Sequence, residues 1–102
     1  MEQQNGDIKK ELHGDKKYLL RLYITGSAPR SLIAVNNITQ ICKNHLVDYE
    51  LQIIDVYQKP NLAKEDQIIA IPTLVKVLPL PERRIIGDLS DVEKVLYSVE
   101  LL

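Results

Sequence analysis

Hydrophobic and polar positions follow different periods along the first half of the chain. Residues 18–25 form a nearly continuous run rich in β-formers, which predicts a strand covered on both faces. From 28 to 45 the apolar residues recur every three or four positions, as on one side of an amphipathic helix. Residues 49–55 begin with the alternation of a second strand. A strand, a helix and a strand in this order predict a right-handed crossover between two parallel strands.

The second half of the chain has weaker local preferences. Residues 61–69 begin with an asparagine that can cap a short helix, although 67–71 also suits a strand, and we favour the helix. Residues 73–78 and 83–86 are strand candidates on either side of Pro79-Leu80-Pro81. This arrangement predicts an antiparallel hairpin.

A third helix is expected at the end of the chain. Ser90 and Glu93 have the spacing of a capping box, in which each side chain satisfies a backbone N–H group of the first turn. The apolar residues that follow at steps of three and four are Val92, Val95, Leu96, Val99 and Leu102. They predict a helix that packs on the sheet up to the last residue. The expected order is β-α-β-α-β-β-α, an α/β fold with a mixed sheet.

Residues 1–16 differ from the rest of the chain, because they are polar and charged and carry too little apolar surface to pack. We expect them to form a flexible N-terminal extension. The remaining residues, 17–102, have the length of one domain.

Charge and cysteine content exclude several classes of function. The formal net charge of -1 provides no global field that would attract nucleic acid or an anionic membrane. No apolar run approaches the ~20 residues that a membrane-spanning helix needs.

The single cysteine, Cys42, cannot form an internal disulfide, and neither His13 nor His45 has a second ligand at metal-site spacing. We therefore expect a cytoplasmic protein without a metal or other cofactor.

The segment Ile71-Pro72-Thr73 opens the third predicted strand. This tripeptide and the order of elements resemble the thioredoxin fold, in which the proline is cis and faces the active site. Redox chemistry on that fold requires a thiolate at the start of the first helix. Here that corner reads Ser27-Ala28-Pro29-Arg30, and Cys42 lies far along the helix on its core-facing side. A redox enzyme is therefore excluded, and no other catalytic group is assigned.

A more specific resemblance covers residues 17 to 102. Its motifs are 18–26, 54–56, 60–63, 65–66, 72–74, 76–81 and 83–91. These segments closely resemble the KaiB family of bacterial circadian clock proteins. The resemblance implies a non-enzymatic protein that binds KaiC, a hexameric ATPase and autokinase, and modulates its phosphorylation and signalling output in a circadian, timing or stress-related process.

The resemblance also implies two folds for one sequence. One is a resting homo-oligomer, a dimer or tetramer with a rearranged second half, and the other is a thioredoxin-like monomer that binds KaiC. Pro72, Pro79 and Pro81 lie in the segment of divided preference and are candidates for the switch. Ser98 and Glu100 are further candidates, because the family commonly has Gly and Asp there. Serine exceeds glycine in helix propensity by roughly 0.5 kcal/mol, which favours the final helix.

Lys76, Arg83 and Arg84 are the candidate partner-binding residues, since a basic patch on the hairpin suits an acidic surface of a KaiC-like ring. The alternative is a solvated edge whose cations discourage strand pairing. Glu50 and Gln52 replace the small residue and lysine of clock members on a strand that contacts KaiA. KaiA is therefore a doubtful partner.

Tyr18 and Tyr23 on the first strand suit the edge of a core and a subunit interface equally well. A second function class also stays open, namely a thioredoxin-fold sensory or adaptor module in a histidine-kinase pathway. A kinase portion would favour it, and this chain contains none.

Overall fold

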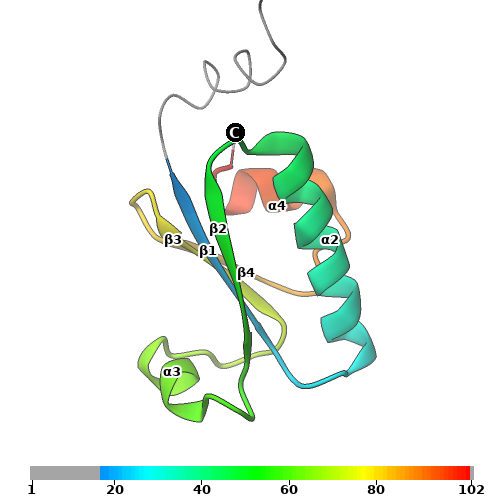
Figure 1. Ribbon diagram of the computed structural model, residues 1–102, viewed down its shortest axis with the longest axis vertical. Helices are drawn as coiled ribbons and strands as arrows, with labels where there is room; N and C mark the ends of the chain where they lie inside the picture. The colour runs from blue at the N-terminus through cyan, green and yellow to red at the C-terminus, as the bar shows by residue number, and fades with distance from the viewer. Residues whose placement is uncertain (1–16, 102) are drawn as a thin grey trace, which may run out of the picture.

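Each segment picked out by the hydrophobic pattern forms an element of the expected type. The computed structural model describes residues 17–101 (Figure 1). In chain order the elements are β1 (Tyr18–Ile24), α2 (Pro29–His45), β2 (Tyr49–Asp55), α3 (Pro60–Glu65), β3 (Thr73–Leu78), β4 (Arg83–Ile86) and α4 (Val92–Ser98). The expectations for residues 1–16 and for Leu102 lie outside the described residues.

The strands form one sheet in the order β2-β1-β3-β4. β1 and β2 are parallel, because α2 returns the chain to the end of the sheet where β1 began. β3 runs antiparallel to β1, and β4 runs antiparallel to β3. The mixed sheet expected from the sequence is therefore confirmed, with β2 and β4 as its edges.

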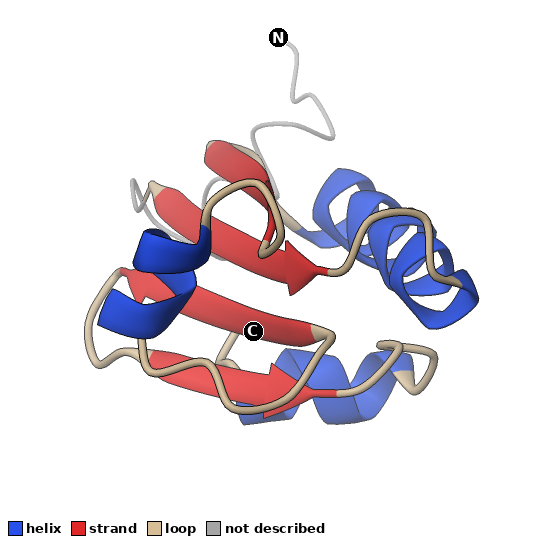
Figure 2. Cartoon of the chain, turned by 90° about the horizontal axis from the view of Figure 1, so that it is seen from below, coloured by secondary structure: helices blue, strands red, loops and turns tan. Residues whose placement is uncertain are grey.

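Alternation along the strands divides the apolar residues between the two faces. Leu20, Leu22 and Leu74 belong to the main core, which α2 and α4 complete. Tyr23 and Val75 form the centre of a smaller cluster under α3. Figures 1 and 2 show α2 and α4 on one face and α3 over the other. Because α3 has only six residues, it covers only part of that face of the sheet, and polar side chains occupy the rest.

The ends of α4 differ from the prediction. The N-cap is Asp91, whose carboxylate accepts a hydrogen bond of 3.1 Å from the backbone N–H of Lys94, so Ser90 is not the capping residue. Val92 is 43% exposed and does not join the buried side of the helix. The helix ends at Ser98 rather than continuing to the end of the chain.

α3 also ends before the predicted Ile69. Gln67 has a φ of 56°, in the left-handed region. Its N–H donates to the carbonyl of Lys64 at 3.0 Å, and the N–H of Ile68 donates to the carbonyl of Ala63 at 2.9 Å. This pair of bonds is the Schellman motif that closes a helix, and the turn takes Ile68 into the apolar cluster under α3.

Replacing Gln67 with glycine is expected to raise the free energy of unfolding by about 0.5–1 kcal/mol, because glycine adopts this φ without strain. Urea denaturation measures the change. The matched control is Glu65→Gly in the last turn of the same helix, which should lower stability by about 1 kcal/mol. Destabilisation by Gln67→Gly would contradict the assigned turn.

Candidate functional site

One row of side chains crosses all four strands on the face that α3 partly covers. Arg21 pairs with Gln52 across β1 and β2, and with Val75 across β1 and β3. Val75 in turn pairs with Arg84 across β3 and β4. Paired residues on neighbouring strands point to the same face. The register therefore places one arginine at the centre of this face and another at its β4 edge.

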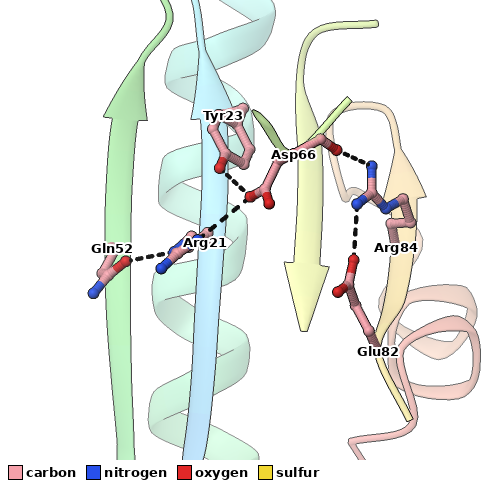
Figure 3. Close-up of polar contacts among 6 residues, drawn as sticks. All are labelled: Arg21, Tyr23, Gln52, Asp66, Glu82 and Arg84. Carbon is pink, nitrogen blue, oxygen red and sulfur yellow. Dashed lines mark hydrogen bonds and ion pairs between the residues drawn. The ribbon is translucent and has the colours of Figure 1, made fainter. Parts of the chain in front are cut away.

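A polar network links this row to the end of α3 (Figure 3). The Nε of Arg21 donates to Oε1 of Gln52 at 2.8 Å, and its Nη1 lies 3.4 Å from Oδ2 of Asp66. The hydroxyl of Tyr23 donates to the same carboxylate oxygen of Asp66. Gln52 in turn donates to the carboxylate of Glu50 at 2.8 Å. Asp66 thus fixes the end of α3 to the centre of the sheet.

Arg84 is attached to this network from the edge strand. Its Nη1 donates to the backbone carbonyl of Asp66 at 2.8 Å, and its Nη2 lies 2.8 Å from a carboxylate oxygen of Glu82 (Figure 3). The Arg84 side chain is nevertheless 38% exposed. The network therefore holds a cation in a defined place at the surface.

Tyr23 remains a hydrogen-bond donor across the neutral pH range. Burial is the main cause that raises the pKa of its phenol, and the adjacent Asp66 carboxylate raises it further, to about 12. Arg21 acts in the opposite direction but is outweighed. The protonated phenol can thus stabilise the charged carboxylate of Asp66 without competing for a proton.

Lys76 lies on the other face and is buried, which corrects the expected exposed basic patch. Its side chain is 2% exposed, and its Nζ lies 3.7 Å from a carboxylate oxygen of Glu100. Arg83 approaches the other oxygen of Glu100 at 3.5 Å. Arg83 and Arg84 are both exposed, but they point to opposite faces of β4. The three predicted cations therefore do not form one patch.

Tyr18 and Tyr23 are 3% and 0% exposed, so in this fold they belong to the interior and offer no surface to a second subunit. Of the two alternatives, a place in the core and a place in a subunit interface, this fold has the first for both tyrosines. The exposed aromatic residues are Tyr57 and Tyr97, which the sequence did not single out.

The switch candidates lie in two places. The bonds before Pro72, Pro79 and Pro81 are all cis. Ser98 is the last residue of α4, so its propensity for a helix interior has little effect, which corrects that argument. Glu100 follows in the left-handed region with a φ of 56°. The alternative fold remains a prediction.

The corner that carries the thiols in redox proteins holds no sulfur. The hydroxyl of Ser31 accepts a hydrogen bond of 3.1 Å from the backbone N–H of Thr25 and closes the turn before α2. Cys42 is buried, and burial raises the pKa of its thiol to about 12, so it stays protonated at neutral pH.

Within residues 17–101, no group of three or more His, Cys, Asp or Glu side chains is placed to hold a metal ion. No helix in this range is both long and apolar enough to cross a membrane.

Solved structures with this arrangement include thioredoxins. Mitochondrial thioredoxin 3 of Saccharomyces cerevisiae has a TM-score of 0.69 at 19% identity, covering 91% of this chain and 86% of that chain. The N-terminal domain of SasA from Synechococcus elongatus has a TM-score of 0.67 at 27% identity, covering 80% of each chain. The chain is therefore a thioredoxin-like domain that lacks the thiol pair.

Sequence comparisons identify the family within this fold class. The KaiB domain model matches residues 21–101. The circadian clock oscillator protein KaiB of Prochlorococcus marinus is 52% identical over 88 residues, covering 85% of this chain and 84% of that protein. The protein of the same name from Synechococcus elongatus is also 52% identical over 88 residues, covering 85% of this chain and 86% of that protein. The chain belongs to the KaiB family.

Proposed function

We propose that this protein is a non-enzymatic, cytoplasmic regulator that binds a KaiC-family ATPase ring and modulates its phosphorylation and signalling output. Membership of the KaiB family supports the choice of partner. The choice of binding surface rests on Arg84, which is exposed yet held in place by contacts with Asp66 and Glu82.

The electrostatics favour a local contact. The net charge of -1 gives the chain no overall attraction for an acidic partner, so attraction must come from placed cations. A cation already held in position loses less side-chain entropy on binding than a free one. Arg84 meets this requirement, and Arg83 on the other side of the same strand extends the cationic edge.

Charge reversal at Arg84 is expected to weaken capture of the KaiC-family ATPase from the same cell by about tenfold, because a favourable contact becomes repulsive. Binding is measured by gel filtration after long incubation with each phosphorylation state of the ATPase. Lys43→Glu, on α2 at the opposite face, is the matched control and should bind like the wild type. Absence of co-elution for the wild type would refute the proposed function.

A second candidate function is an adaptor role in a histidine-kinase pathway. The observation that favours it is the structural similarity to the N-terminal domain of SasA, at 27% identity. The same gel-filtration assay with the histidine kinases of the cell tests it. KaiA is not a proposed partner, because Gln52 is engaged with Arg21 and Glu50 and the strand lacks the lysine that clock members carry.

The resting homo-oligomer, dimer or tetramer, is also a proposal that rests on family membership. In the fold described here Tyr18 and Tyr23 are buried, so they can reach a second subunit only after rearrangement. The molecular mass in solution, measured by light scattering, tests this part.

A further inference from the structure

A surface groove of 370 Å³ lies at the outer edge of β4, between the α3–β3 connection and α4. Four isoleucines line it together with Arg84 and Lys94. The walls are fixed to each other, because Thr73 and Ile86 pair across β3 and β4 and the N–H of Gly87 donates to the carbonyl of Pro72 at 3.0 Å. Its volume is within the ~300–1,000 Å³ range of ligand-binding pockets.

Two of the isoleucines that line the groove are exposed. Ile69 is 91% exposed and Ile86 is 56% exposed. The left-handed turn at Gln67 explains the first value, because it sends Ile68 inward and leaves its neighbour Ile69 outside. Ile86 points to the same face as Arg84, away from the main core. The fold therefore presents these side chains to water, and a partner that covers them gains hydrophobic free energy.

The two charged side chains that line the groove, Arg84 and Lys94, are both basic. Glu82 lies outside the lining and forms an ion pair with Arg84 at 2.8 Å. Among the described residues, the Lys94 ammonium forms no salt bridge, and the hydrogen bond to Asp91 involves only its backbone N–H. An occupant that satisfies the groove must combine an apolar side chain with a nearby carboxylate.

We propose that this groove binds a short apolar segment of the partner protein that carries aspartate or glutamate. The inference deepens the proposed function and rests on it for the identity of the partner. It extends the binding surface from Arg84 to Lys94, Ile69 and Ile86. Apolar contact supplies affinity, and the two cations set the preference for an acidic segment.

The test titrates the isotope-labelled full chain with a blocked peptide of alternating leucine and aspartate, followed by NMR. The amide signals of Ile69, Ile86 and Lys94 are expected to shift together. A peptide with lysine in place of aspartate should bind at least tenfold more weakly. Equal binding of the two peptides, no binding of either, or equal binding of a single-stranded oligonucleotide would overturn the proposal.

Variants localise the effect. Ile69→Asp and Lys94→Glu should each weaken binding of the acidic peptide by about tenfold, since each removes one of the two kinds of contact. Leu80→Asp is the matched control, because Leu80 is 74% exposed in the hairpin turn outside the groove. Native amide spectra of the variants establish that the fold is intact. Wild-type binding by Ile69→Asp or Lys94→Glu would overturn the proposal.

The same variants separate this inference from the proposed function. If Arg84→Glu weakens capture of the ATPase while Ile69→Asp and Lys94→Glu do not, the function stands and the groove is not its site. If the peptide binds as described but the wild-type protein never captures the ATPase, the groove stands and the proposed partner is wrong.

Discussion

Replacing Glu100 with lysine is expected to lower the free energy of unfolding by about 3 kcal/mol. Glu100 provides a carboxylate that faces the buried Lys76, at 3.7 Å, and the exposed Arg83, at 3.5 Å. Breaking a buried ion pair by removing one partner typically destabilises by about 3–5 kcal/mol. We place the effect at the lower end, because the Glu100 side chain is 47% exposed and water can partly compensate. Urea denaturation of the full chain measures it.

The control for this prediction removes the buried charge instead. Lys76→Met keeps the apolar stem of the side chain and should change stability by less than about 1 kcal/mol, since a buried pair adds little beyond a well-packed apolar residue. In the double variant, Lys76→Met should restore most of the stability that Glu100→Lys removes. An effect of Glu100→Lys within about 0.5 kcal/mol, as for an ordinary surface substitution, would contradict the assigned role.

The strong elements could be predicted from local pattern alone. β1 and α2 lie within a residue or so of their predicted bounds, because a continuous apolar run and a long amphipathic stripe each leave one favourable structure. The hairpin was also predictable, since the prolines separate two short strand candidates and favour a turn between them. The sheet order was not predicted, because β3 pairs with β1 rather than with β2, the strand that precedes it in the sequence.

The start of α4 shows where local pattern is insufficient. Ser90 and Asp91 are both good capping residues, so the sequence does not decide between them. The buried Leu89, 4% exposed with a φ of 65°, anchors the chain in the core immediately before the helix. Tertiary packing thus places Asp91, rather than Ser90, at the cap.

Part of the candidate site could be recognised from sequence and part could not. Arg83 and Arg84 were predicted as exposed cations of the hairpin and both are exposed, while their role in binding stays a prediction. Lys76 was misplaced, since its burial comes from tertiary packing that includes Glu100, a residue that follows α4. Asp66 lies in a motif but was given no role in the site, although one signal existed: a carboxylate at the end of a helix opposes the helix dipole and therefore needs another reason to be there.

Replacing Asp66 with alanine is expected to lower the free energy of unfolding by about 2 kcal/mol. The substitution leaves the Tyr23 hydroxyl and the Arg21 guanidinium without their shared carboxylate, and hydrogen bonds to charged groups contribute about 1.5–3 kcal/mol. Alanine keeps the backbone carbonyl that Arg84 uses, so the surface cation should stay in place. Glu65→Ala, an exposed neighbour in α3, is the control and should remain within about 0.5 kcal/mol of the wild type.

The pH dependence of the same variant separates this network from a general loss of packing. The pKa of Tyr23 is raised from 10.0 to about 12 in the folded state, so its contribution to stability is complete below pH 10 and is lost as the pH rises toward 12. Removing Asp66 takes away one of the causes of that increase, and the variant should therefore lose less stability than the wild type over this window. Cys42 and Tyr18, whose pKa values burial also raises, titrate in both proteins, so the difference between the two curves reports on Tyr23. Parallel curves from pH 9 to 12 would show that the Asp66 carboxylate does not act on the phenol.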